Sequence, residues 1–101
     1  MTNSQDIYAV YGASGYGREV MPLARHLLIT AGISTDRLVF VDDAPGPALV
    51  NGVRLLNYSQ FLNEPAGNRY AALAIANSGI REKLAHNLEK DGVRPWAVQA
   101  A

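Results

Sequence analysis

The chain of 101 residues contains no cysteine, and its nine basic residues are balanced by nine acidic ones. The absence of cysteine excludes disulfide bonds and thiolate zinc sites. The net charge of zero argues against a nucleic-acid partner, which would require a basic face. A phosphate-bearing ligand would therefore have to be held by backbone amides and a helix end rather than by a cationic patch.

Long apolar runs are also missing, so we expect neither a membrane-spanning segment nor a membrane partner. The first six residues, MTNSQD, are polar and do not resemble a secretion signal, which favours a cytoplasmic protein. The only histidines are His26 and His86, and neither has a paired carboxylate or a second ligand at metal spacing. The sequence therefore predicts no metal site and no catalytic residue within this chain.

What remains is a sequence that is 49% hydrophobic, which is typical of one globular domain over residues 1–101. The apolar patterns predict strands at 7–11, 38–41, 53–56, 70–75 and 94–98. Helical spacing predicts two main helices, from about residue 15 to 31 and from about residue 80 to 88, and Ser59 is expected to cap a brief helix through Leu62. Pro22 lies beyond the first turn of the first helix, and we expect it to loosen or kink that helix.

Strands that alternate with helices indicate βαβ units and a parallel sheet. We therefore predict a Rossmann-like α/β fold, a doubly wound half-domain with a mostly parallel sheet of about five strands flanked by helices. The expected strand order is 53–56, 38–41, 7–11, 70–75 and 94–98, which creates a switch point beside the first strand. Ligands bind at such points, outside the carboxyl ends of the strands. Residues 12–17, 42–43 and 76–78 are expected to converge there.

The loop from Gly12 to Gly17, with the sequence GASGYG, follows a strand and opens a helix. Free backbone amides at a helix start carry partial positive charge, and glycine lets a ligand approach them closely. The loop departs from the dinucleotide fingerprint because Ser14 occupies the position of the middle glycine. We expect it to bind phosphate; the alternative is a tight turn that binds nothing.

Two acids, Asp42 and Asp43, follow the second predicted strand. Rossmann proteins place an acid there to accept hydrogen bonds from a ribose, so these carboxylates are expected to serve a sugar hydroxyl or a base N–H. The alternative is a solvated turn or a helix cap. Similarly, Asn77 or Ser78 is expected to cap the helix that follows.

Four motifs in order carry a family resemblance, and they stand at residues 11–20, 39–43, 50–53 and 74–81 as YGASGYGREV, VFVDD, VNGV and AIANSGIR. Together they resemble the N-terminal, PglD-like domain of the bacterial sugar O- and N-acyltransferases, such as sialic acid O-acetyltransferases and acetyltransferases of UDP-linked aminosugars. The resemblance implies a domain that binds the nucleotide part of a UDP-sugar. The positions it assigns to this role are Ser14, Gly15, Tyr16, Asp42, Asp43 and Ala76, with Gly12 and Gly17 in the phosphate loop.

The chain departs from the family pattern at three places. Tyr16 stands where histidine is usual, Ala76 replaces a common glycine, and Ser78-Gly79 replaces a more polar pair. The family chain continues into a left-handed β-helix that forms a trimer, binds acetyl-CoA and supplies the catalytic histidine, so the resemblance implies that this chain is inactive alone. Two alternative functions remain open: an NAD(P)-binding module of an oxidoreductase, and a non-catalytic interaction or regulatory domain.

Overall fold

The computed structural model describes residues 5–98 of the chain. Within that range the strands are β1 (Ile7–Tyr11), β2 (Leu38–Val41), β3 (Leu49–Val50), β4 (Val53–Leu56), β5 (Arg69–Leu73) and β6 (Arg94–Pro95). The helices are α1 (Gly15–Thr30), α2 (Tyr58–Asn63) and α3 (Ser78–Lys90). The alternation of strands and helices confirms the predicted Rossmann-like α/β class.

The strands form one six-stranded sheet in the order β3-β4-β2-β1-β5-β6. The pairs β1–β2, β1–β5, β2–β4 and β5–β6 are all parallel. This arrangement confirms the predicted strand order and the switch point, because the chain crosses from β4 on one side of β1 to β5 on the other. The carboxyl ends of β1, β2 and β5 consequently lie along one edge of the sheet.

The prediction that 53–56 is the edge strand was wrong, because β3 pairs antiparallel with β4 and forms the edge instead. Asn51 and Gly52 join the two strands, with φ angles of 50° and 79°. Two consecutive positive φ values suit the two-residue hairpin turn for which Asn-Gly is the preferred sequence. The sequence thus contained a hairpin signal that the strand pattern alone did not reveal.

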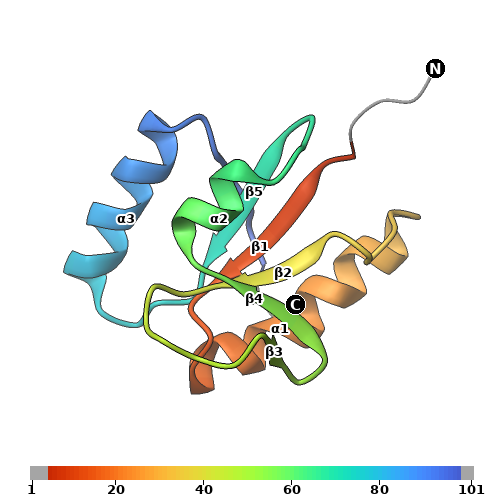
Figure 1. The fold of residues 1–101 in the computed structure, drawn as a ribbon, viewed down its shortest axis with the longest axis horizontal. Helices are drawn as coiled ribbons and strands as arrows, with labels where there is room; N and C mark the ends of the chain where they lie inside the picture. Colours follow the sequence, from red (N-terminus) through yellow and green to blue (C-terminus); the bar gives the residue numbers. More distant parts are fainter. Residues whose placement is uncertain (1–4, 99–101) are drawn as a thin grey trace.

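Residues of β1 alternate between two hydrophobic clusters. Ile7, Ala9 and Tyr11 pack with the side that includes Phe61 of α2 and Leu88 of α3, whereas the other β1 side chains pack with residues of α1. Figure 1 shows α1 and α3 on opposite sides of the sheet. Because β1 is buried along its whole length, the central strand is a rigid support for the loop that follows it.

The helices match the predicted spans, and one predicted cap is wrong. α1 runs from Gly15 to Thr30 with Pro22 inside it, as the helical spacing predicted. α2 is capped by Asn57 rather than by Ser59, through a reciprocal capping box with Gln60. Asn57-x-x-Gln60 matches the capping-box pattern in a variant form, with asparagine in place of serine or threonine.

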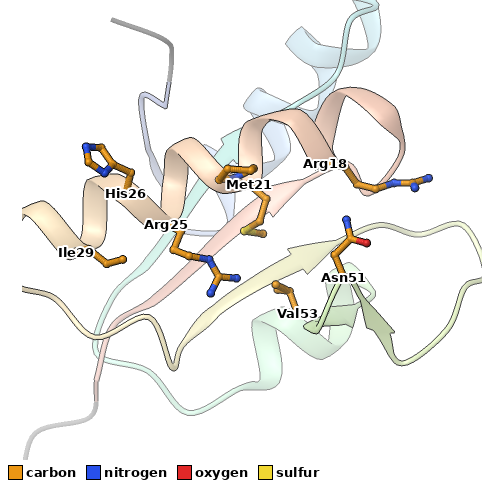
Figure 2. Close-up of a pocket in the computed structure, with 8 residues that line it drawn as sticks. Arg18, Met21, Arg25, His26, Ile29, Asn51 and Val53 are labelled. Carbon is orange, nitrogen blue, oxygen red and sulfur yellow. The ribbon is translucent and has the colours of Figure 1, made fainter.

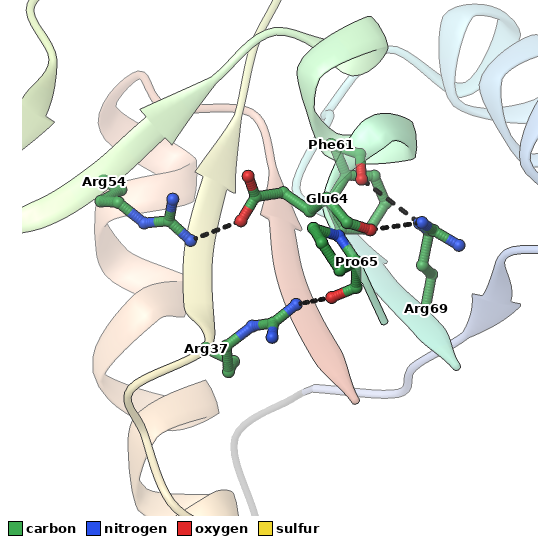
Figure 3. A network of polar contacts seen from close by, with 6 residues as sticks. All are labelled: Arg37, Arg54, Phe61, Glu64, Pro65 and Arg69. Atoms are coloured by element: carbon green, nitrogen blue, oxygen red, sulfur yellow. Dashed lines mark hydrogen bonds and ion pairs between the residues drawn. The ribbon is translucent and has the colours of Figure 1, made fainter. Parts of the chain in front are cut away.

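A network of arginines lies at the amino ends of the strands, opposite their carboxyl ends (Figure 3). Arg69 at the start of β5 donates to the carbonyls of Phe61 and Glu64, and Arg37 before β2 donates to the carbonyl of Pro65. Arg54 and Glu64 form an ion pair at 3.0 Å. These contacts hold the α2–β5 connection in place and leave the carboxyl edge free.

No helix in the described part of the chain has the length and apolar character needed to cross a membrane.

Candidate functional site

The turn between β1 and α1 requires glycine at both of its ends. Gly12 has a φ of 118°, and a Cβ added there would lie 2.7 Å from the carbonyl oxygen of Ala74. A Cβ on Gly17 would lie 1.7 Å from the carbonyl oxygen of Gly12. These two residues therefore allow β1, α1 and the end of β5 to approach one another, the roles that the first and last glycines play in Rossmann loops.

The amino end of α1 presents unpaired backbone donors. Ser14 is the N-cap residue, its side chain makes no capping hydrogen bond, and its carbonyl accepts from Arg18 N at 2.9 Å. Within residues 5–98, the N–H groups of Gly15, Tyr16 and Gly17 have no hydrogen-bond partner. By contrast, Asn77 caps α3 by accepting a hydrogen bond from Ile80 N at 3.0 Å. This confirms the predicted helix cap at residues 77–78.

Asp42 joins the glycine turn to the segment after β2. Its Oδ2 accepts from the backbone N–H of Ala13 at 3.0 Å, and its Oδ1 accepts from that of Ala44 at 2.9 Å. A carboxylate offers about four lone-pair positions, so each oxygen retains a second one for another donor. Asp42 therefore combines a structural role with capacity to accept a hydrogen bond from a ligand.

Asp43 is held by the other face of the sheet. Its Oδ2 accepts from the Tyr11 hydroxyl and its Oδ1 from the backbone N–H of Tyr58, each at 3.0 Å. Burial raises the pKa of the Tyr11 hydroxyl, and the hydrogen bond to Asp43 raises it further. Burial likewise raises the pKa of the Tyr58 hydroxyl, which donates to Asp91 at 2.7 Å. Asp43 thus binds a backbone N–H at the amino end of α2, which agrees with the alternative prediction of a helix-capping role.

Two adjoining grooves open at this edge of the sheet. The first, of about 410 Å³, lies between Ser14 and Arg18 of the first turn of α1, the 44–47 segment and the β3–β4 hairpin. The second, of about 390 Å³, lies between that same segment and the amino end of α2. Asp42 lines both grooves, so its carboxylate stands where they meet.

The structure distributes the sequence-predicted residues unequally over this edge. Ser14 and Asp42 line the first groove, and Asp42 and Asp43 line the second. Gly12 and Gly17 form the turn itself. Gly15, Tyr16 and Ala76 line neither groove, although all three are exposed near the same strand ends. The expected convergence of three segments is therefore observed for the first two, whereas residues 76–78 lie outside both grooves.

A third groove, of about 300 Å³, runs beside α1 rather than across the strand ends (Figure 2). Figure 2 shows Arg18 and Arg25 of α1 on the side that faces Asn51 and Val53 of the hairpin. His26 also lines this groove, and both His26 and His86 are exposed. No group of three or more potential metal ligands occurs in residues 5–98.

Sequence reasoning missed two groove residues, Asn57 and Gln60 of the capping box. Their side-chain oxygens accept from each other's backbone N–H groups, both at 2.8 Å. Only the capping-box spacing signalled them, and that signal describes a helix start rather than a binding site.

Comparison with known proteins adds three findings. The family model described as the PglD N-terminal domain matches residues 8–88. GDP-perosamine N-acetyltransferase of Escherichia coli O157:H7 is 34% identical over 94 residues, which cover 93% of this chain and 42% of that protein. The solved structure of WeeI from Acinetobacter baumannii AYE is 45% identical with a TM-score of 0.88, over 96% of this chain and 45% of that one. The chain thus spans less than half the length of these relatives.

Proposed function

The chain belongs to the PglD N-terminal domain family, and we propose that it binds the nucleotide part of a nucleoside diphosphate sugar as the acceptor-binding domain of a bacterial sugar acetyltransferase. The observation that carries this proposal is the meeting of three unpaired helix amides with the Asp42 carboxylate at the carboxyl edge of the sheet. One of these features attracts anions and the other accepts hydrogen bonds from hydroxyl or N–H groups, and a nucleotide requires both.

The diphosphate is expected at the amino end of α1. The amides of Gly15, Tyr16 and Gly17 point out of the first turn, and a helix amino end favours negative charge. Arg18, which directly follows these three residues, lines the first groove and supplies a guanidinium for a phosphate oxygen. The open space around Gly15, where an added Cβ would meet no atom within 4 Å, permits close approach.

The ribose is expected beside Asp42, since a carboxylate at this position of a Rossmann sheet accepts hydrogen bonds from ribose hydroxyls. The Asp42 carboxylate would repel a phosphate group. We therefore expect it to contact the ribose, while the diphosphate contacts the helix amides. The family resemblance favours UDP as the nucleotide, whereas the name of the E. coli relative favours GDP. Both are nucleoside diphosphates joined to a sugar, and the proposal covers both.

The acetyl transfer itself belongs, in this proposal, to a longer protein. The family pattern implies a C-terminal β-helix domain that binds acetyl-CoA, supplies the catalytic histidine and forms a homotrimer in the cytoplasm. The lengths of the two relatives, of which this chain matches 42% and 45%, leave room for such a domain. The present chain would then position the acceptor sugar and carry no catalytic residue.

Ligand titration separates this proposal from an NAD(P)-binding module. Calorimetry with UDP, GDP, UDP-sugars and NAD is expected to give dissociation constants of about 0.1–1 mM for the diphosphate ligands, because part of the pocket would come from the second domain. NAD should bind more weakly, since Ser14 replaces the middle glycine of its fingerprint. Tighter binding of NAD would overturn the proposal, and binding of none of these ligands would favour an interaction domain.

A further inference from the structure

The third groove, which runs beside α1, adjoins the first groove. Arg18 and Asn51 line both of them, so the two grooves meet beside the first turn of α1. A ligand whose diphosphate lies at the amino end of α1 can therefore extend past Arg18 into the third groove. In a nucleotide sugar, the part that follows the diphosphate is the sugar.

Positive charge gathers in the third groove. Arg18, Arg25 and His26 line it, and no acid among the described residues does so. Within residues 5–98 the one ion pair joins Arg54 to Glu64, so no acid neutralises either guanidinium of the groove. This local excess occurs in a chain whose formal net charge is zero. The groove therefore favours a ligand that carries an anionic group in addition to its diphosphate.

Between the two arginines, the groove has the surfaces that a sugar ring requires. Met21 and Val53 are buried and give it an apolar floor. Pro22 has no N–H, so the carbonyl of Arg18, four residues earlier, lacks its helical donor and remains available to a sugar hydroxyl. Figure 2 shows the Asn51 side chain directed from the hairpin toward α1, where its amide offers both a donor and an acceptor.

We infer that the third groove binds the sugar of the nucleotide ligand, and that this sugar carries a carboxylate that pairs with Arg25. Seven residues separate Arg18 from Arg25, which corresponds to about 10 Å along a helix. That separation leaves room for one sugar ring between a diphosphate at Arg18 and a carboxylate at Arg25. A guanidinium matches a carboxylate in charge and in its two parallel N–H donors. The inference rests on the proposed function, and it names the substrate class as nucleoside diphosphate sugars whose sugar is acidic.

Two matched pairs of ligands test this inference. UDP-glucuronic acid is compared with UDP-glucose, and GDP-mannuronic acid with GDP-mannose, because the members of each pair differ only by a carboxylate in place of a hydroxymethyl group. For the unchanged chain, calorimetry should show the acidic member binding about fivefold more tightly in the pair whose nucleotide the chain prefers. Arg25→Gln, which keeps a long polar side chain with good helix propensity, should abolish this preference, and Arg25→Glu should reverse it.

A control variant and a second measurement keep the result interpretable. Arg94→Gln removes the same charge at an exposed position of β6 that lines none of the three grooves, and it should leave the preference unchanged. In NMR spectra, UDP-glucuronic acid should shift the amides beside Arg25, whereas UDP alone should not. Circular dichroism checks that each variant is folded.

Equal affinity of the unchanged chain for the acidic and neutral sugars would overturn the inference, while binding of UDP or GDP would leave the proposed function standing. A preference that survives Arg25→Gln would also overturn it. The same holds for a preference that Arg25→Gln and Arg94→Gln reduce equally, because overall charge would then account for the effect. If neither pair of sugars binds and UDP and GDP do not bind either, the proposed function fails and the inference fails with it.

Discussion

The carboxylate of Asp42 and the backbone N–H of Ala13 are joined by a hydrogen bond of 3.0 Å. This contact connects the end of β2 to the glycine turn after β1, across 29 residues of sequence. Since the other oxygen of the same carboxylate holds Ala44 N, one side chain sets the relative position of two walls of the first groove. Asp42, which we propose to contact the ribose, therefore also holds the two loops that form the groove.

Replacement of this carboxylate should cost stability. Asp42→Asn leaves a single oxygen for two backbone donors, and we expect the free energy of unfolding to fall by about 1–2 kcal/mol. Urea denaturation followed by circular dichroism measures the loss. Asp36→Asn is the matched control, because that exposed side chain accepts no hydrogen bond within residues 5–98. Equal stability of the two variants would show that Asp42 does not brace the turn.

Two glycines of the loop should respond in opposite ways to alanine. Gly17→Ala would place a Cβ 1.7 Å from a backbone oxygen, so we expect a loss of more than about 3 kcal/mol or failure to fold.

Gly15→Ala places the methyl in open space at the first position of α1, and stability should be unchanged or higher by up to about 1 kcal/mol. Nucleotide affinity should nevertheless fall, because the methyl obstructs approach to the helix amides. A folded Gly15→Ala variant that binds UDP or GDP as tightly as the unchanged chain would show that the loop is only a turn. Gly15 does not have a positive φ, so we expect steric obstruction to be the cause of the lost affinity.

The sequence was sufficient to predict the fold class and the order of the main strands, because short segments of sequence specify these strands. The buried strands β1 and β2 are short apolar runs, and they are followed directly by Gly12 and by Asp42 at the carboxyl ends of the sheet. β3 escaped prediction because two residues carry no periodicity, although Asn51-Gly52 specified its turn. The helical spacing predicted that α1 crosses Pro22, and the helix does so, because burial of one helix face offsets the lost backbone hydrogen bond.

The candidate site was only partly predictable for a different reason. Position after a strand identified Ser14, Asp42 and Asp43, but it could not show toward which face each side chain turns. The structure directs Asp42 to the glycine turn and Asp43 to Tyr11 and α2. Gln60 was missed because its contribution to the groove depends on tertiary contact between two segments.

Stability should decline at alkaline pH. The pKa values of the Tyr11 and Tyr58 hydroxyls are raised in the folded chain, so the folded state holds these protons more tightly than the unfolded state does. Their contribution is fully present below the ordinary tyrosine pKa of about 10 and is lost as pH rises above it. Urea midpoints between pH 8 and 11 measure this loss, which should be smaller in Tyr58→Phe. A midpoint that stays constant over this range would contradict the assignment.

The chain alone should transfer no acetyl group. Transfer from a thioester requires a base near the acceptor and a second site for the acyl-CoA. His26 is a residue of α1 that lines the third groove, and His86 is exposed on α3. Neither histidine lines the two grooves at the strand ends. Incubation with acetyl-CoA and nucleotide-linked aminosugars, followed by a colorimetric thiol assay, should give only the spontaneous rate. Faster release that is lost in His26→Ala or His86→Ala would place the chemistry within this chain.

The most direct test of the proposed nucleotide site is a titration of the isotope-labelled chain with UDP and with GDP, followed by amide chemical shifts in NMR spectra. We predict that the largest shifts occur in the first turn of α1, at Gly15, Tyr16 and Gly17, and at Ala44 and Gly46 of the 44–47 segment, with little change beside Arg25 in the third groove. Shifts concentrated in the third groove, or no saturable shift with either nucleotide at millimolar concentration, would contradict the account.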